Sequence, residues 1–174
     1  MAQDSGDPAG RRGPQANAAK GRFPSGVTIV TGLTDDEPFG LTVSAFTPLG
    51  ATMASVWILR SASVHPRLRA SETFGVNVLG ADQAALASRF ASSGIDRFAS
   101  TEWTPGQSGV PIFPGVAASM EVAIGERIDA SDYTILLGTV LSAQAHDDVA
   151  PLVYWRGTFW DGGSLITAEV LDAR

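Results

Sequence analysis

The sequence predicts a mainly β protein in which antiparallel strands form a barrel accompanied by a few short helices. Six or seven runs rich in β-branched and aromatic residues recur along the chain, and Gly or Pro bounds most of them. The connections between these runs are mainly short, and only two stretches have helical composition. Short connections favour hairpins, whereas a doubly wound parallel sheet needs a helix after nearly every strand.

The first half of the chain predicts a hairpin followed by a buried strand. The β-branched run at 26–32 lies between glycines, and a turn at 34–38 leads into a second strand at 39–47. The apolar run ASVWIL at 54–59 is short enough for a buried strand. A loop that begins with Arg60 follows, so its polar groups lie at the end of a strand.

The second half predicts two helices and the remaining strands. A short helix at 65–72 has Pro near its start, and a second helix at 81–91 has an apolar stripe at Leu86 and Phe90. The Gly- and Pro-rich stretch at 103–115 is a loop. The other predicted strands are 73–79, 118–128, 133–143 and 152–160.

The length of 174 residues predicts one domain, which we place at 21–161, with a tail at each end. Residues 1–20 are rich in Gly, Pro, Ala and charge, a composition typical of a disordered tail. In the C-terminal tail, 162–174, the pairs Leu165-Ile166 and Val170-Leu171 could form a short swapped or capping segment.

Composition excludes several classes of function. A net charge of −6 argues against nucleic-acid binding, and the absence of cysteine excludes disulfides and thiol catalysis. No run of eighteen apolar residues and no secretion signal is present, so we expect a cytoplasmic protein without a membrane span. The charged fraction of 17% is somewhat low, which indicates a surface covered by a second copy of the chain.

Two segments carry groups that suit a planar, phosphorylated ligand. Gly40–Phe46 reads GLTVSAF and alternates small polar positions with apolar ones, like a strand edge lying against a flat ring. Arg60–His65 reads RSASVH and offers a guanidinium and hydroxyls, which can donate charge-assisted hydrogen bonds to a phosphate. The residues alone leave alternatives open, because Thr42 and Ser44 can equally face water and serine-rich loops are common.

Together with FPSGVTIVT at 23–31, FGVNVL at 74–79 and RFASSGIDRF at 89–98, these segments resemble the short-chain flavin reductase family. The resemblance runs from about Phe23 to Trp160. It implies an FMN-binding type of split barrel with Greek-key topology, and a homodimer. It also implies an NAD(P)H:flavin oxidoreductase that reduces FAD or FMN, FAD being slightly favoured, with NADH or NADPH as hydride donor. The free reduced flavin would go to a partner flavin-dependent monooxygenase.

The resemblance further implies which residues hold the flavin. Ser61 and Ser63 would contact the phosphate, and Arg97 would supply the countercharge at a position where relatives often carry Lys. Pro24 and Ser25 would pack near the reactive face of the ring. The ring would lie along the second strand, where backbone N–H groups and one side chain meet its pyrimidine edge. That strand contributes Thr42, Val43, Ser44 and Ala45.

Asp132 and Tyr133 would also line the cofactor site, but here the chain departs from the family pattern. Relatives often read Gly-Asp-His-Thr, with the histidine near the nicotinamide, whereas this chain has Ser131 and Tyr133. Hydride transfer needs stacked rings at close approach rather than an acid of a particular pKa. Tyr133 could therefore still form one wall of the nicotinamide pocket. The loop at 47–53 is a second departure, since relatives usually carry an acidic residue and a proline pair there.

No pattern in the sequence predicts a catalytic side chain or a metal site. HExxH, a P-loop and a GxGxxG after a strand are all missing, and a metal would find only carboxylates beside two histidines. This fits a protein whose cofactor performs the chemistry. Asn77, an amide inside an apolar strand, must be hydrogen-bonded, and we favour a structural role for it over a flavin contact.

Two rival functions remain from the sequence. A non-catalytic split barrel that binds flavin or haem would keep the cofactor groove and lose the nicotinamide pocket, with Tyr133 as its only support. A monooxygenase acting on its own organic substrate is disfavoured, because the chain is too short to enclose both flavin and substrate.

Overall fold

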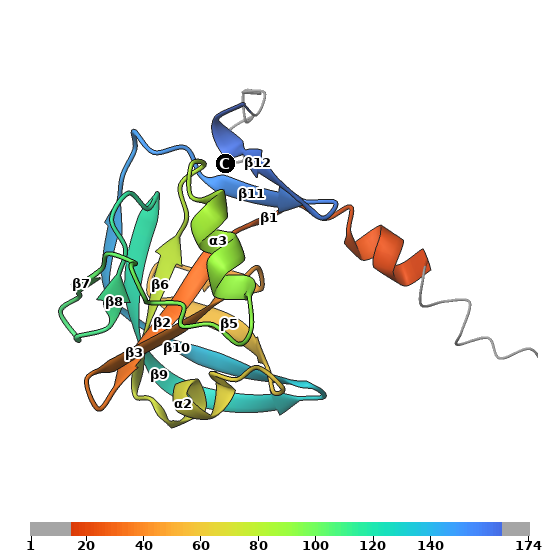
Figure 1. Ribbon diagram of the computed structural model, residues 1–174. Coiled ribbons are helices and arrows are strands. Elements are labelled where there is room, and N and C mark those ends of the chain that lie inside the picture. Colours follow the sequence, from red (N-terminus) through yellow and green to blue (C-terminus); the bar gives the residue numbers. More distant parts are fainter. Residues whose placement is uncertain (1–14, 165–174) are drawn as a thin grey trace, which may run out of the picture.

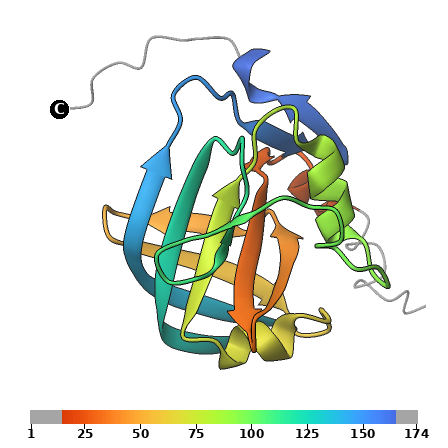
Figure 2. The same ribbon diagram turned by 60° about the vertical axis from the view of Figure 1, so that its left-hand side comes forward.

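A seven-stranded antiparallel sheet curls into a barrel in the computed structural model, which describes residues 15–164 (Figures 1 and 2). The strand order is β3-β2-β6-β9-β10-β5-β4, and every pairing is antiparallel. The predicted antiparallel barrel is therefore confirmed. Its strands are β2 (Thr28–Thr34), β3 (Glu37–Val43), β4 (Phe46–Leu49), β5 (Met53–Leu59), β6 (Thr73–Val78), β9 (Ala118–Ala130) and β10 (Tyr133–Ala145).

The two edge strands of this sheet, β3 and β4, are consecutive in the chain. They are joined only by Ser44 and Ala45, and the N–H of Trp57 on β5 donates to the carbonyl of Ala45 at 3.0 Å. The prediction of one continuous strand at 39–47 is wrong at this point. The chain bends there because it passes from one edge of the curled sheet to the other.

A second, three-stranded sheet contains β1 (Ser25–Gly26), β11 (Leu152–Trp155) and β12 (Thr158–Asp161). The predicted strand at 152–160 is in fact the β11–β12 hairpin, which reverses at Arg156 and Gly157. Two further short strands, β7 (Thr104–Pro105) and β8 (Pro111–Ile112), pair within the predicted loop at 103–115.

Two helices cover the barrel. The short α2 (His65–Ala70) closes one end and places Leu68 in the core inside the barrel, with Val56 and Phe74. The longer α3 (Ala84–Ala91) lies against the outside and buries Phe90 in a second core, between the barrel and β11 (Figure 1).

The ends of the chain differ in part from the prediction. Residues 15–20 are helical and exposed, and they project away from the barrel (Figure 1), where the sequence predicts a disordered tail; residues 1–14 lie outside the described part. Gly162–Ser164 forms a 3-10 turn, and the segment with Leu165-Ile166 and Val170-Leu171 lies outside the described residues. Within residues 15–164, no helix has the length and apolar character needed to cross a membrane.

Candidate functional site

The bend between β3 and β4 forms one wall of a cavity of about 530 Å³, which we call the Ser44 pocket. A volume of this size lies within the range of small-molecule sites in proteins. Four of the residues predicted to contact flavin line this pocket, and its other lining residues are mainly apolar. The predicted contacts are Pro24, Ser25, Ser44 and Ala45, and the further lining residues include Phe23, Thr28, Phe46 and Val78.

The backbone N–H groups of Ser44 and Ala45 make no hydrogen bond to any other described residue. Both residues lie between strands, outside the ladders, and both are exposed. The side chain of Thr28 donates to the carbonyl of Val43 at 2.7 Å and fixes the strand end that precedes them. The bend therefore presents two free donors to a ligand in the Ser44 pocket.

The side chains of Thr42 and Val43 both have partners within the protein. Thr42 donates its hydroxyl proton to the carbonyl of Ala87 at 2.6 Å, which ties β3 to α3. Val43 is buried in the barrel core. A contact of either residue with a ligand would therefore come from its backbone, which belongs to an edge strand of the sheet.

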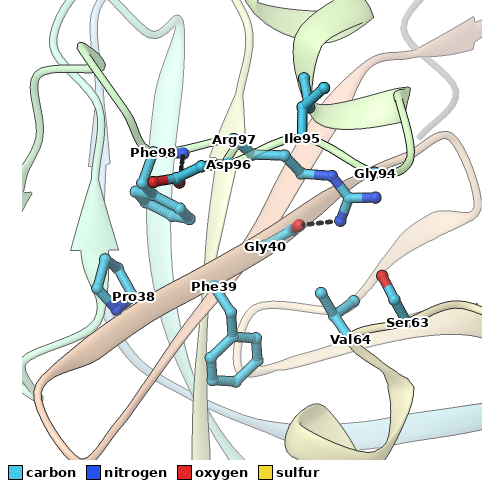
Figure 3. A pocket seen from close by; sticks show the side chains of 10 residues that line it. All are labelled: Pro38, Phe39, Gly40, Ser63, Val64, Gly94, Ile95, Asp96, Arg97 and Phe98. Carbon is cyan, nitrogen blue, oxygen red and sulfur yellow. Dashed lines mark hydrogen bonds between the residues drawn. The ribbon is translucent and has the colours of Figure 1, made fainter.

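A second cavity, of about 190 Å³, lies farther along β3 and contains Ser63 and Arg97 (Figure 3). We call it the Arg97 pocket. Arg97 donates from Nε to the carbonyl of Ser92 at 2.9 Å and from one terminal nitrogen to the carbonyl of Gly40 at 2.8 Å. Its other terminal nitrogen makes no hydrogen bond within the described residues, and the Ser63 hydroxyl faces the same space in Figure 3.

The electrostatics of the Arg97 pocket favour an anion. Burial lowers the pKa of the Arg97 guanidinium, because desolvation disfavours its charged form. The carboxylate of Asp96 also lines the pocket, but it points toward the N–H groups of Phe98 and Ala99, which donate to it at 3.0 and 3.2 Å (Figure 3). The guanidinium therefore lacks a carboxylate partner in the described residues, and a phosphate would supply one.

Arg89 on α3 supports the loop that carries Arg97. Its guanidinium donates to the carbonyls of Arg97 at 2.8 Å, Asp96 at 3.0 Å and Ala99. This loop has no regular secondary structure of its own, so Arg89 is its main anchor to a helix. The sequence analysis missed this role, although an arginine eight residues before Arg97 on a predicted helix was visible.

Gly40 at the Arg97 pocket and Ser44 at the Ser44 pocket lie on one continuous stretch of backbone. Four residues of extended chain span about 13 Å, so one elongated ligand with a flat ring and an anionic tail can reach both cavities. The apolar lining and free amides suit a flavin ring, and the arginine and hydroxyl suit its phosphate.

The structure does not bring three predicted residues into these cavities. Ser61 is exposed in the loop before α2 and lines neither pocket. Asp132 and Tyr133 lie at the β9–β10 turn, where the N–H of Arg60 donates to the carbonyl of Asp132 at 2.8 Å. Tyr133 instead packs edge-on against Trp57 on the outer face of the barrel.

A third cavity, which the sequence analysis missed, adjoins the Ser44 pocket. It measures about 370 Å³, and we call it the Arg156 pocket. Phe23, Ser25, Ser44 and Ala45 line both cavities. The residues that line only the third are Lys20, Gly21, Tyr154, Arg156 and Gly157.

Two buried polar side chains have structural roles. Asn77 donates to the carbonyls of Ile29 and Pro111, both at 3.3 Å, and accepts from the N–H of Phe113 at 2.9 Å. The structural role favoured for Asn77 is the one observed. Glu121 on β9 accepts hydrogen bonds from the N–H groups of Gln107 at 2.8 Å and Ser108 at 2.6 Å, in the loop between β7 and β8.

Within residues 15–164, no group of three or more His, Cys, Asp or Glu side chains is placed to hold a metal ion. What the described site offers is a set of donors, a cation and apolar walls. Such a set can bind and orient a planar anionic cofactor.

Comparisons with known proteins agree with this chemistry. The family model of the flavin reductase like domain matches residues 20–163. The FMN reductase (NADH) SmoA of Agrobacterium fabrum is 37% identical over 154 residues, which cover 87% of this chain and 87% of that protein. The reductase component of the 4-nitrophenol 4-monooxygenase/4-nitrocatechol 2-monooxygenase of Rhodococcus opacus is 37% identical over 141 residues, covering 80% of this chain and 75% of that protein.

A solved structure extends the similarity to three dimensions. The NADH:FAD oxidoreductase SgcE6 of Streptomyces globisporus, in complex with NAD and FAD fragments, matches with a TM-score of 0.81 at 33% identity. The match covers 97% of this chain and 98% of that chain. This chain therefore belongs to the flavin reductase like domain family and has its split-barrel fold.

Proposed function

We propose that this protein is an NADH-dependent flavin reductase that reduces FAD or FMN and hands the reduced flavin to a separate flavin-dependent monooxygenase, in the cytoplasm. Its relatives include an NADH-dependent FMN reductase and the reductase component of a nitrophenol monooxygenase. The observation that carries the proposal is the pair of free N–H groups at Ser44 and Ala45 beside an apolar cavity. Those donors would suit a ligand that has acceptors along one edge and apolar faces, as an isoalloxazine ring has.

We place the flavin ring in the Ser44 pocket and its phosphate in the Arg97 pocket. In the Arg97 pocket, the free terminal nitrogen of Arg97 and the hydroxyl of Ser63 would donate to phosphate oxygens. Ser61 lies two residues before Ser63 in the same loop but does not line the pocket. Pro24 and Ser25 would lie against the ring from the side of β1.

A bound flavin would supply the chemistry, namely acceptance of a hydride from NADH, with NAD⁺ released and a solvent proton taken up. The residues of this chain bind and orient. The Ser44 and Ala45 amides fix the edge of the ring, Arg97 fixes the tail, and no side chain needs to transfer a proton.

A second copy of the chain would cover the outer face of the barrel. Tyr133 pairs with Leu59, and Trp57 lies two residues away on β5, so all three side chains share one face. We call this the outer apolar face. Its most exposed large side chains, each 39% to 43% exposed, are Leu49, Met53, Trp57, Leu59, Ile128 and Tyr133. We propose that it forms a homodimer interface, because a contiguous exposed apolar patch marks an interaction site and a second copy of the chain can cover it symmetrically. Asp132 and Tyr133 would then face the second copy and contribute to a cofactor site only across that interface.

The test is NADH oxidation by the purified protein, followed at 340 nm, with FAD or FMN added in turn under anaerobic conditions. We expect oxidation that depends on added flavin and reduction of that flavin in equal amount. Flavin binding by fluorescence without NADH oxidation would contradict the reductase and favour a carrier. A protein that binds no flavin at all would remove both readings.

A further inference from the structure

The Arg156 pocket has the composition of an anion site, although the protein as a whole is acidic. Lys20 and Arg156 both line it, and no carboxylate of the described residues does. The net charge of the whole chain is −6. Two cations in a cavity without a carboxylate therefore make this part of the surface positive on an otherwise acidic protein. A cavity of this kind attracts a ligand with negative charge.

The turn that carries Arg156 has an unfavourable residue for its conformation. Arg156 and Gly157 connect Trp155 to Thr158 with φ values of 54° and 80°, as a type I′ turn requires. The first position of this turn favours Asn, Asp or Gly, because other residues are strained at positive φ. The β2–β3 hairpin of the same chain has Asp at both turn positions, Asp35 and Asp36. An arginine at a strained backbone position motivates a search for a function of its side chain.

Hydrogen bonds hold the two cations on the same wall. The N–H of Arg156 donates to the carbonyl of Gly21 at 3.2 Å, and the indole N–H of Trp155 donates to the carbonyl of Arg22 at 3.0 Å. The β11–β12 turn is thereby fastened to the segment that begins with Lys20. The Arg156 guanidinium lies 5.4 Å from the centre of the Trp155 ring, which supports it from one side.

Exposed aromatic rings accompany the cations. Phe23 is 78% exposed and lines both the Ser44 and the Arg156 pockets, and Tyr154 is 40% exposed in the Arg156 pocket. A large apolar ring left in water at a cavity mouth offers a stacking surface for a flat ligand. Cations and rings together match a nucleotide, which has phosphates and a base.

We infer that the Arg156 pocket binds the pyrophosphate of NADH, and that Lys20 and Arg156 position this substrate for hydride transfer. The inference rests on the proposed function, because it places the nicotinamide beside a flavin in the Ser44 pocket. The shared wall at Phe23, Ser25, Ser44 and Ala45 makes the two cavities neighbours. The flavin's own phosphate is accounted for by Arg97 at the far end of β3, so a second basic pocket is available for a second anionic substrate.

The variant Arg156→Asn separates binding from folding. Asn is a preferred residue at this turn position, so the turn keeps or gains stability while the charge is lost. We expect the KM for NADH to rise about tenfold, the scale for losing one charge-assisted hydrogen-bond partner. The kcat at saturating NADH should stay within about twofold, and the Kd for FMN, measured by fluorescence, should not change. Lys20→Ala should act in the same direction, and Arg156→Lys should retain part of the affinity.

Arg22→Ala is the matched control, because it removes a neighbouring positive charge whose side chain lines neither pocket. A binding measurement without turnover, titration of NAD⁺ into the FMN-loaded protein by calorimetry, should show the same loss for Arg156→Asn. An unchanged KM and NAD⁺ affinity in Arg156→Asn would overturn the inference. A raised Kd for FAD with an unchanged Kd for FMN in Arg156→Asn would also overturn it, because that result would mean that the pocket binds the adenylate of FAD. Failure of the unaltered protein to reduce flavin would instead remove the proposed function.

Discussion

Arg97 donates a hydrogen bond to the carbonyl oxygen of Gly40 at 2.8 Å and so joins the loop after α3 to β3, the strand that ends at Val43, one residue before Ser44. With Nε bound to the carbonyl of Ser92, the guanidinium is held at two points before any ligand arrives. A donor that is already ordered loses little entropy on binding, so its remaining N–H groups are effective toward an anion.

Replacing Arg97 should weaken flavin binding. We expect Arg97→Ala to raise the Kd for FMN by about 10- to 100-fold, or roughly 1–3 kcal/mol, because a charge-assisted donor to the phosphate is lost. Fluorescence titration measures the effect. Riboflavin, which lacks the phosphate, should bind equally well to both proteins. Arg127→Ala is the control, since Arg127 also donates to backbone carbonyls but lines neither pocket. An unchanged Kd in Arg97→Ala would count against the phosphate position.

Filling the Ser44 pocket should abolish flavin binding without unfolding the protein. Ser44 is exposed, so a tryptophan there would occupy the cavity rather than the core. We expect Ser44→Trp to lose flavin-dependent NADH oxidation while its thermal midpoint stays close to that of the parent. Ser93→Trp, an exposed position outside the pocket, serves as control. Normal flavin saturation of Ser44→Trp would move the ring elsewhere.

Arg89 should act on flavin affinity through Arg97. The variant Arg89→Met keeps the length of the side chain but loses the three hydrogen bonds to the 96–99 loop. We expect faster amide hydrogen exchange in that loop and a weaker affinity for FMN. In a double-mutant cycle with Arg97→Ala, the two losses should be less than additive, because both act on one contact. Full additivity would mean that Arg89 serves stability alone.

Glu121 should make the protein sensitive to acid. Burial raises the pKa of Glu121, but hydrogen bonds from the hydroxyl and N–H of Ser108, from Ser142 and from the N–H of Gln107 outweigh this and lower the pKa below its ordinary value. These bonds measure 2.6 Å from the Ser108 N–H and 2.8 Å from both Ser142 and Gln107. A carboxylate whose folded pKa is lowered stabilises the fold above its unfolded pKa, near 4.3, and this stability is lost as pH falls through the folded value.

The measurement is the free energy of unfolding between pH 3 and 7 for the parent and for Glu121→Gln. At pH 7 the variant should be less stable by roughly 1–3 kcal/mol, because the donors on Gln107, Ser108 and Ser142 lose a charged acceptor. Its stability should also fall less steeply below about pH 4.5. Glu126→Gln, an exposed position on the same strand, should keep the parent profile. Parallel profiles for Glu121→Gln and the parent would show that the carboxylate does not contribute.

A charge on the outer apolar face should separate the copies of the chain. Trp57→Glu places a carboxylate beside Tyr133 and Leu59, where a buried unpaired charge would be costly. We expect the parent to sediment as a dimer and the variant as a folded monomer. Thr52→Glu, an exposed position before β5, is the control. A parent protein that is already monomeric at micromolar concentration would refute the proposed interface.

The strand pattern was predictable, whereas its interruptions were not. The runs at β2, β5 and β6 follow from composition because buried strands are rich in β-branched and other apolar residues, even though each also holds a buried polar residue. The turn at Arg156 could not be predicted, because arginine is not a residue that type I′ turns favour. The run at 152–160 therefore has the pattern of one strand. The bend at Ser44 could not be predicted for a related reason, since neither Ser44 nor Ala45 interrupts a β pattern by itself.

The site was predictable to the level of segments. Ser44 and Ala45 in one cavity, and Ser63 with Arg97 in another, are brought together from parts of the chain that the sequence also singled out. The hydroxyl of Thr42 could not be assigned, because its acceptor, the carbonyl of Ala87, lies 45 residues away. The position of Tyr133 depends on which face of β10 packs inward. The sequence next to the β9–β10 turn does not indicate that face, so the contact of Tyr133 with Trp57 could not be predicted.

The free N–H groups of Ser44 and Ala45 at the β3–β4 bend affect how readily a ligand can enter and leave the Ser44 pocket. Both residues are at the surface, so water can take over their hydrogen bonds when a ligand leaves, and no dry polar group remains behind. Departure of the ligand breaks no strand ladder. A pocket built in this way suits a flavin that binds and dissociates in every catalytic cycle rather than one that stays permanently bound.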